Sequence, residues 1–228
     1  MAEDGIELPD SPYIRIKPSR LPDDFDLIDA GVLLPLCECL SAVRNFDINE
    51  NTDVLIYGAG PMGLTAIQAL KGVYGVKQVI VVDRIAERLQ MARENGADLT
   101  LDNTDQPLAE QLAQRQLAPT LVIDAACHPA ILQEAILLAS PAARIGILGF
   151  SGEASTLTQQ SITSKEISIF SSRLNSGRFP LVIDWMEKGL IRPEALITHC
   201  MPLEQVKEAM EIFANDRKTC CKVLLQLG

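Results

Sequence analysis

The feature that most constrains this chain is a glycine-rich loop between an apolar run and a helical pattern. The apolar run is residues 53–57, and the loop after it reads Gly58-Ala59-Gly60-Pro61-Met62-Gly63. In such a loop the first glycine permits a tight turn, the second lets the backbone approach a pyrophosphate, and the third lets the helix pack against the strand. The helix presents its unpaired N–H groups and positive dipole end to phosphates. The spacing predicts a dinucleotide-binding loop that includes Pro61 and Met62.

An acidic residue follows at the expected distance. Residues 78–83 form a second apolar run, which ends in Asp83, twenty residues after Gly63. An acid at this point accepts hydrogen bonds from the hydroxyls of the adenosine ribose. Its carboxylate would repel a 2′-phosphate, so the sequence favours NAD over NADP, and we expect Arg84 to stack on the adenine. The alternative is that the glycines serve only a structural turn.

The order of apolar runs and helical patterns predicts the fold. Continuous apolar runs indicate strands that are buried on both faces of a parallel sheet. We expect strands at residues 53–57, 78–83, 120–125 and 144–150, and an edge strand at 166–171. Helical patterns lie between them at residues 61–74, 84–95 and 129–140. This alternation predicts an α/β fold, a doubly wound parallel Rossmann sheet of six strands in the order 3-2-1-4-5-6.

Further elements are expected before and after this sheet. They are a strand at 13–16, a helix at 29–45 with Asp29 as N-cap, a helix at 179–188, a strand near 196–198, a helix at 203–213 and a strand at 222–227. The helix at 203–213 carries apolar residues at the spacing of a core-facing stripe. These residues are Leu203, Val206, Met210 and Phe213.

Composition excludes several classes of partner. The chain has 228 residues, of which 47 % are hydrophobic, and a formal net charge of −10. This acidity argues against a nucleic-acid surface and against binding to an anionic membrane. No apolar stretch has the length of a membrane span, and residues 1–10 do not resemble a signal peptide. We therefore expect a cytoplasmic protein whose six cysteines are reduced thiols.

Other residues are candidates for the far side of the ligand. Cys127 follows the run at 120–125, and Gly149 and Phe150 end the run at 144–150. The carboxyl ends of parallel strands line the ligand crevice, so all three are expected near the nicotinamide. A catalytic pair of Cys127 with His128 is an alternative, although sequence neighbours rarely face each other as such a pair requires.

Several segments carry a family resemblance. They are DVLIYGAGPMGLTAIQALK, VIVVDRIAERLQMARENGAD, TLVIDAACHPAIL, RIGILGF and GLIRPEALITHCMPLEQVKEAME. These segments resemble the cofactor domain of zinc-dependent medium-chain alcohol and polyol dehydrogenases. The starvation-sensing, alcohol-dehydrogenase-like branch is the most similar, particularly across LKGVYGVKQVIVVDRIAERL and SSRLNSGRFPLVIDW. The resemblance covers about residues 20–228 and is weaker before residue 50.

The resemblance implies a division of the chain. Residues 1–28 would be a remnant or linker of a GroES-like catalytic domain, and residues 29–198 the NAD-binding Rossmann domain. Residues 199–228 would supply a helix and a strand that return to the remnant. It also implies that Arg173 lies near the pyrophosphate, with a solvent-facing loop charge as the alternative. A homodimer is expected, because cofactor domains of this family pair through edge strands such as 166–171.

The chain departs from the family where zinc chemistry resides. It has no Cys-Gly-x-Asp, Gly-His-Glu or four-cysteine segment, and leucine occupies the place of the acid in the family's Glu-Pro pair, in the stretch 33–36. Its two histidines, His128 and His199, belong to no ligand motif, and we expect His199 in a turn. Cys37 and Cys39 with Cys220-Cys221 are a four-thiolate alternative, but their spacing fits buried thiols better. We expect no zinc and assign no catalytic residue.

Three functions follow from these observations. The first is an NAD(H)-binding part of an alcohol or polyol dehydrogenase-like oxidoreductase that does not oxidise alcohols alone, because nothing stabilises the alkoxide. The second is a working dehydrogenase whose catalytic groups come from another chain or from a metal-free acid–base site. The third is a non-catalytic module that senses NAD or mediates an interaction.

Overall fold

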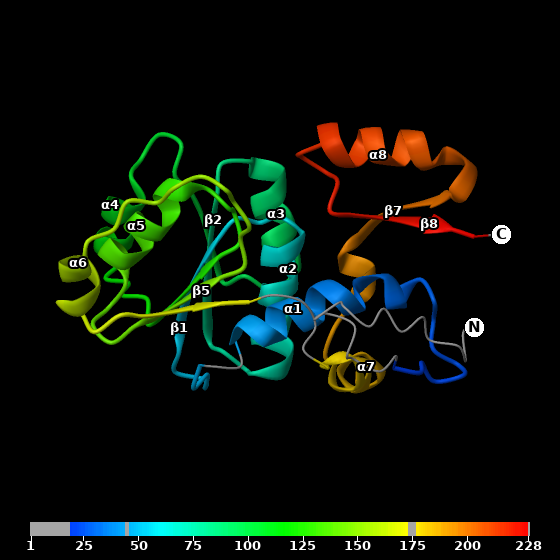
Figure 1. The fold of residues 1–228 in the computed structure, drawn as a ribbon, viewed down its shortest axis with the longest axis horizontal. Coiled ribbons are helices and arrows are strands. Elements are labelled where there is room, and N and C mark those ends of the chain that lie inside the picture. The colour runs from blue at the N-terminus through cyan, green and yellow to red at the C-terminus, as the bar shows by residue number, and fades with distance from the viewer. Residues whose placement is uncertain (1–18, 44–45, 173–176, 228) are drawn as a thin grey trace, which may run out of the picture.

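The computed structural model describes residues 19–43, 46–172 and 177–227. A parallel six-stranded sheet in the order β3-β2-β1-β4-β5-β6 forms its centre, which confirms the predicted fold and strand order (Figure 1). The strand predicted at 13–16 lies outside the described residues. The strands of the sheet are β1 (Asp53–Tyr57), β2 (Gln78–Asp83), β3 (Leu99–Asp102), β4 (Leu121–Asp124), β5 (Arg144–Ile147) and β6 (Ser168–Ser171).

Helices cover both faces of the sheet. The α-helices are α1 (Leu33–Val43), α2 (Pro61–Gln68), α3 (Ala86–Glu94), α4 (Leu108–Gln114), α5 (Pro129–Leu138), α6 (Gln159–Thr163), α7 (Phe179–Glu187) and α8 (Val206–Asn215). The shorter turns are the 3-10 helices η1 (Asp29–Val32), η3 (Pro193–Ala195) and η4 (Leu203–Gln205) and the π-helix η2 (Ala69–Val73). Helices α1, α2, α3 and α7 lie on one face, and α4 and α5 lie on the other (Figure 1).

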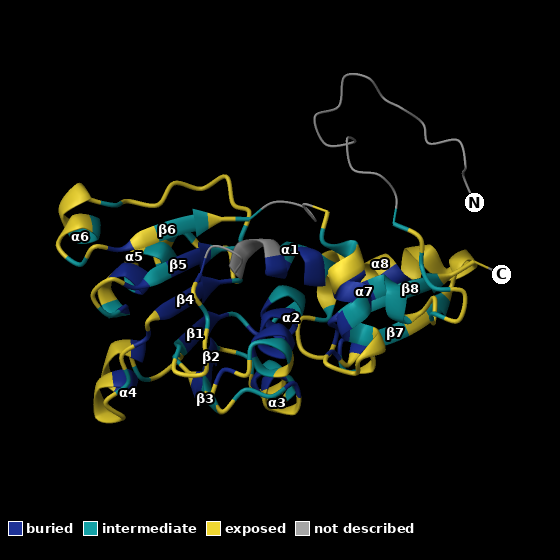
Figure 2. Ribbon diagram, turned by 90° about the horizontal axis from the view of Figure 1, so that it is seen from below, coloured by how far each residue is buried: buried dark blue, intermediate teal, exposed yellow. Residues whose placement is uncertain are grey.

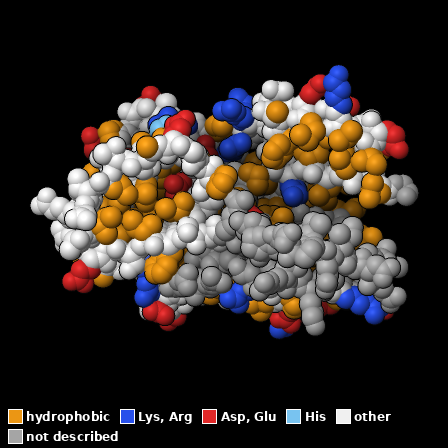
Figure 3. Space-filling view, viewed as in Figure 1, with side chains coloured by type: hydrophobic (Ala, Val, Ile, Leu, Met, Phe, Trp, Pro, Cys, Tyr) orange, Lys and Arg blue, Asp and Glu red, His pale blue; other side chains and the backbone are white. Residues whose placement is uncertain are grey.

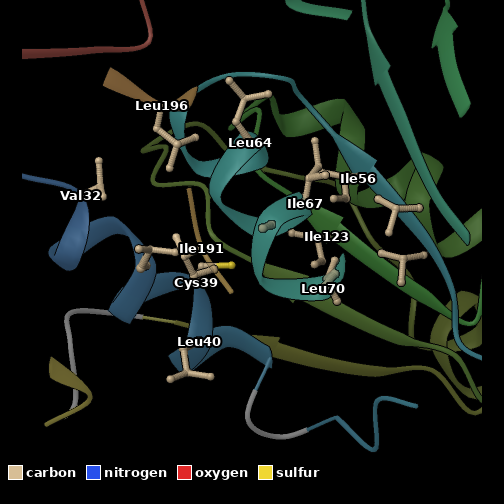
Figure 4. Close-up of a cluster of buried hydrophobic side chains, with 14 of the residues drawn as sticks. Val32, Cys39, Leu40, Ile56, Leu64, Ile67, Leu70, Ile123, Ile191 and Leu196 are labelled. Carbon is tan, nitrogen blue, oxygen red and sulfur yellow. The ribbon is translucent and has the colours of Figure 1, made fainter. Parts of the chain in front are cut away.

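Two hydrophobic cores form because the strands are buried on both sides. Alternate strand residues point to opposite faces, so Ile56 and Ile123 pack under α2, whereas Leu55 and Val122 pack under α4 and α5. Figure 4 shows the first core, in which Ile56 and Ile123 meet Ile67 of α2 and side chains of α1. The central strands are the most buried part of the molecule (Figure 2).

A second, smaller unit lies against η1, where Leu224 is within 2.4 Å of a Cβ built on Gly31. Strands β7 (Ile197–Pro202) and β8 (Lys222–Gln226) form a parallel two-stranded sheet, and α8 connects them (Figure 1). The strand predicted near 196–198 is therefore longer than expected. His199 lies in β7 and pairs with Val223, so the expectation that it lies in a turn was wrong.

The spacing of the apolar residues in η4 and α8 led us to expect that they face a core. In the structure they do not. Ala209 is the buried residue of α8, whereas the apolar stripe is exposed to solvent. Figure 3 shows hydrophobic side chains gathered where α8 and the strands beneath it lie. The exposed fractions of the stripe are 42 % for Leu203, 43 % for Val206, 64 % for Met210 and 57 % for Phe213.

Side-chain contacts shift the ends of several elements. The helix expected at 84–95 begins only at Ala86, because the Asp83 carboxylate binds the two preceding amides. It ends as predicted at Gly96, which has a φ of +107°. Helix α2 gives way to a π-helical turn at Ala69, before residue 74. The first helix lacks the expected cap, since Asp29 opens a 3-10 turn and no side chain caps it.

Strand β3 and helix α4 were not located from the sequence, although six strands were expected. Strand β3 has only four residues, with Thr100 and the exposed Asp102 among them, so its apolar signal is weak. All six cysteines are free, and the four in the two close pairs, Cys37 with Cys39 and Cys220 with Cys221, are buried. Over the described residues, no helix is both long and apolar enough to cross a membrane.

The core under α2 supplies a first prediction. Ile123 is fully buried, so Ile123→Ala removes apolar contacts and leaves a cavity, which should lower the free energy of unfolding by about 2–5 kcal/mol. Urea denaturation measures this change. Leu137→Ala, at a leucine that is 69 % exposed, is the control and should cost less than about 0.5 kcal/mol. Equal losses in the two variants would contradict this placement of the core.

Candidate cofactor-binding site

The glycine loop joins β1 to α2 in the predicted manner. Gly58 has a φ of +93° and donates from its amide to the carbonyl of Val82 on the neighbouring strand at 2.9 Å. Gly63 presses against the start of the loop, because a Cβ there would lie 1.9 Å from the carbonyl oxygen of Gly58. The space beside Gly60 is more open, since the nearest atom to a Cβ built there is 3.6 Å away.

The first turn of α2 directs its amides to this open space. The amide of Leu64 donates to the carbonyl of Gly60 at 2.9 Å. The amides of Met62 and Gly63 precede that bond and have no partner within the helix, while Pro61 has no N–H. The hydroxyl of Thr65 donates to the carbonyl of Pro61 at 2.7 Å and steadies the turn. An anion beside Gly60 would meet these amides and the positive end of the helix dipole.

Asp83 lies at the end of β2 and contacts the same loop. Its Oδ2 accepts from the amide of Ala59 at 2.8 Å, and its Oδ1 accepts from the amides of Arg84 and Ile85 at 2.7 and 3.0 Å. The carboxylate therefore holds the glycine loop against the end of β2. Arg84 is exposed beside the ends of β2 and β3, where its charge lowers the pKa of Asp102 after the hydrogen bonds from Thr104.

Arg88 is a residue beside the glycine loop that the sequence did not reveal. It lies in the first turn of α3, and its guanidinium is the group 3.6 Å from a Cβ built on Gly60. A cation at this distance is well placed to pair with a phosphate on the loop. The signal that was available is its position five residues after Asp83, but an arginine on a helix is more often solvated than bound to a ligand.

The loops after β4 and β5 lie on the side of β1 opposite to β2. Cys127 is exposed and has a φ of +61°, and its Sγ accepts from the amide of Phe150 at 3.3 Å. Gly149 fits closely beside it, because a Cβ there would lie 2.9 Å from the Cα and Sγ of Cys127. Phe150 is 83 % exposed. The structure thus brings these three predicted residues together, whereas Arg173 lies outside the described residues.

Asp124 is a second residue that the sequence did not reveal. It ends β4, is 5 % exposed, and accepts at Oδ1 from the amides of Ala126 and Cys127 at 3.1 and 3.2 Å. Its carbonyl oxygen accepts from Leu148 and Gly149 at 2.9 and 3.1 Å, which ends β5 three residues earlier than expected. Burial raises the pKa of Asp124, and the two amides oppose that rise.

Cys127 and His128 each contact a different backbone amide. Nδ1 of His128 accepts from the amide of Ala130 at 3.2 Å and so caps α5. The thiol of Cys127 instead contacts the amide of Phe150 at 3.3 Å. Both side chains thus have contacts that organise the loop after β4.

Comparison with known proteins identifies the family. Residues 61–188 match the model of the family described as zinc-binding dehydrogenase, a span of more than half of the chain. This chain belongs to the zinc-binding dehydrogenase family. The match confirms the resemblance to alcohol and polyol dehydrogenases that the sequence motifs indicated.

Individual relatives agree with this assignment. The starvation-sensing protein RspB of Escherichia coli K12 is 60 % identical over 176 residues, which are 77 % of this chain and 52 % of RspB. Human sorbitol dehydrogenase is 28 % identical over 85 % of this chain and 55 % of its own length. This member of the dehydrogenase family spans about half the length of the curated relatives that it matches.

A solved structure is also similar. The protein described as the short chain alcohol dehydrogenase rspB of E. coli CFT073, complexed with NADH, superposes with a TM-score of 0.89 at 53 % identity. The superposition covers 92 % of this chain and 62 % of the rspB chain. The chain is thus more similar to this rspB protein than to human sorbitol dehydrogenase.

The family name implies zinc, but the described residues do not fit the metal. They contain no group of three or more histidine, cysteine or acidic side chains that could hold an ion. Burial raises the pKa of Cys37, Cys39 and Cys221 to about 12. Their environment therefore disfavours the thiolate form, which is the form that binds zinc. We derive no step through zinc.

The close approach of Gly63 to Gly58 yields the second prediction. Gly63→Ala places a methyl group where the Gly58 carbonyl lies, so the loop must shift; unfolding stability should fall by about 1–3 kcal/mol and anion binding at the helix should be lost. Thermal unfolding and calorimetric titration with ADP measure both effects. Gly152→Ala, at an exposed glycine with no atom within 4 Å of a new Cβ, should change neither. A Gly63→Ala variant that binds ADP normally would contradict this account of the loop.

Proposed function

We propose that this chain binds NAD(H) and is the cofactor-binding part of an alcohol or polyol dehydrogenase-like oxidoreductase. The observation that carries the proposal is the loop from Gly58 to Gly63, whose open side faces the start of α2. A diphosphate placed beside Gly60 would accept from the amides of Met62 and Gly63. The guanidinium of Arg88 would offset its charge.

The adenosine half of the dinucleotide would extend toward β2. Asp83 ends that strand, and its carboxylate would accept from the ribose hydroxyls while it retains the amides of the loop. A 2′-phosphate would lie against the same negative charge, so we expect NAD(H) to bind more tightly than NADP(H). Arg84 would cover the adenine from the exposed side of the crevice.

The nicotinamide half would extend toward β4 and β5, on the other side of β1. Cys127, Gly149 and Phe150 would line it there. Bound NAD(H) supplies hydride exchange at the nicotinamide ring. The described residues bind and orient the cofactor but contain no metal cluster that would stabilise an alkoxide. We therefore expect no alcohol oxidation by this chain alone.

The third prediction tests the choice of cofactor. Calorimetric titration should give a Kd for NADH at least about tenfold lower than that for NADPH, a difference of ~1.4 kcal/mol. Asp83→Asn removes the charge at the ribose and should shrink this ratio toward one. Asp102→Asn removes the same charge at the end of the adjacent strand, and it should leave the ratio unchanged. If wild type binds neither cofactor, the proposed function fails; if it prefers NADPH, the role of Asp83 is wrong.

One observation favours a second candidate, a working dehydrogenase completed by another polypeptide. The apolar stripe of η4 and α8, formed by Leu203, Val206, Met210 and Phe213, is exposed. Apolar surface of this kind is normally covered. A partner that brings zinc ligands would then supply the missing chemistry.

The fourth prediction separates the two candidates. Native mass spectrometry of the purified chain should show no stoichiometric zinc, and alcohol should not drive NADH formation. We also expect a homodimer, because β6 is an edge strand of the described sheet and an edge strand can pair with that of a second copy. About one zinc per chain with alcohol-dependent NADH formation would instead support the working enzyme. A monomer at all concentrations would refute the dimer.

A further inference from the structure

The loop after β4 lies directly against the phosphate loop. A Cβ built on Gly58 would be 3.0 Å from the Cβ of Ala126, so the two loops leave no space between them. In the sheet order, β2 and Asp83 lie on one side of β1, and β4 and β5 lie on the other. A dinucleotide held at its diphosphate therefore reaches the loops after β4 and β5 with the half that does not contact Asp83.

Asp124 connects these two loops through four hydrogen bonds. Its carboxylate accepts from the amides of Ala126 and Cys127 in its own loop. Its carbonyl accepts from the amides of Leu148 and Gly149 in the loop after β5. One buried residue thus fixes the relative position of both segments.

The contact between the two loops is tight and depends on that position. Cys127 adopts the left-handed region with a φ of +61°, which a residue other than glycine rarely does. This conformation turns Sγ toward the amide of Phe150 and leaves no room for a side chain on Gly149. The bonds from Asp124 to the amides of Ala126 and Cys127 stabilise the turn that makes the conformation possible.

We propose that Asp124 is a positioning residue that holds the loops after β4 and β5 together and so sets the affinity for the nicotinamide half of the dinucleotide. This inference rests on the proposed function. The carboxylate of Asp124 acts through Cys127, whose contacts with Gly149 and Phe150 join the two loops. The carbonyl bonds of Asp124 to Leu148 and Gly149 do not depend on its side chain. Removal of this side chain should weaken binding of the nicotinamide and leave binding of the adenosine diphosphate half intact.

The property of the Asp124 side chain that matters is its acceptor oxygen rather than its charge. The backbone amides of Ala126 and Cys127 both donate to the same oxygen of Asp124, Oδ1. Burial raises the pKa of Asp124, so the charge is costly here, although the amides of Ala126 and Cys127 and the imidazole of His128 oppose the rise. An asparagine keeps an acceptor oxygen at the same position without the charge. Asp124→Asn should therefore restore what Asp124→Ala loses.

The fifth prediction is tested with two probes, NADH and ADP-ribose, which lacks only the nicotinamide. Calorimetric titration of the full chain gives the ratio of the Kd for ADP-ribose to the Kd for NADH. We expect Asp124→Ala to lower this ratio by about tenfold with the Kd for ADP-ribose unchanged within about twofold, and Asp124→Asn to restore it. The fluorescence enhancement of bound NADH, which reports the surroundings of the nicotinamide, should fall and recover in parallel.

Asp98→Ala is the matched control. Asp98 also accepts a backbone amide, that of Val79 at 2.7 Å, but it precedes β3 at the opposite edge of the sheet. It should leave the ratio unchanged. Equal loss of NADH and ADP-ribose binding in Asp124→Ala, or no loss of either, would overturn the role of Asp124. A wild-type chain that binds neither probe would instead refute the proposed function.

A second variant keeps the proposal testable if Asp124→Ala does not fold. Gly149→Ala places a methyl group 2.9 Å from Cys127 and separates the same two loops without removing a buried polar group. It should lower the ratio of the two dissociation constants as Asp124→Ala does. A Gly149→Ala chain that keeps the wild-type ratio would show that the contact between the loops does not set nicotinamide affinity, and the proposal would be wrong.

Discussion

The contact between Gly63 and the carbonyl of Gly58 is the constraint on which the site depends. There is no room for a Cβ at this point, because it would lie 1.9 Å from the carbonyl oxygen. The close approach lets α2 begin directly after β1, so that the amides of its first turn lie next to the open space beside Gly60. The anion site is thus made by backbone geometry, and neighbouring side chains only refine it.

The features that the sequence located correctly are the glycine loop after β1, Asp83 at the end of β2 and the strand order. The glycines, Asp83 and the strand order obey short-range rules of spacing and the topology of parallel sheets. Arg88 and Asp124 were missed because their roles depend on what faces them. Arg88 reaches across to Gly60 from another helix, and Asp124 joins two loops more than twenty residues apart. Strand β3 was missed because a four-residue edge element with an exposed Asp102 carries little pattern.

The error at α8 has a different cause. Hydrophobic periodicity shows that a helix has an apolar face, but it does not say what covers that face. The stripe of Leu203, Val206, Met210 and Phe213 has the spacing of a core helix, and yet all four side chains are exposed. In α2 the same kind of pattern is buried, because β1 and α1 pack against it. Burial therefore depends on the rest of the fold.

Net charge is an equally poor guide to the site. The chain carries a formal charge of −10, but Arg88 lies beside the glycine loop. Glu87 precedes Arg88 in the first turn of α3 and forms an ion pair of 2.9 Å with Lys218. The hydrogen bond from Lys218 lowers the pKa of Glu87. Burial raises the pKa of Cys220, and the charge of Arg88 is among the effects that oppose this rise. The segment before β8 thus neutralises an acid beside the anion site. The positive side chains beside the glycine loop therefore cannot be inferred from the net charge of the chain.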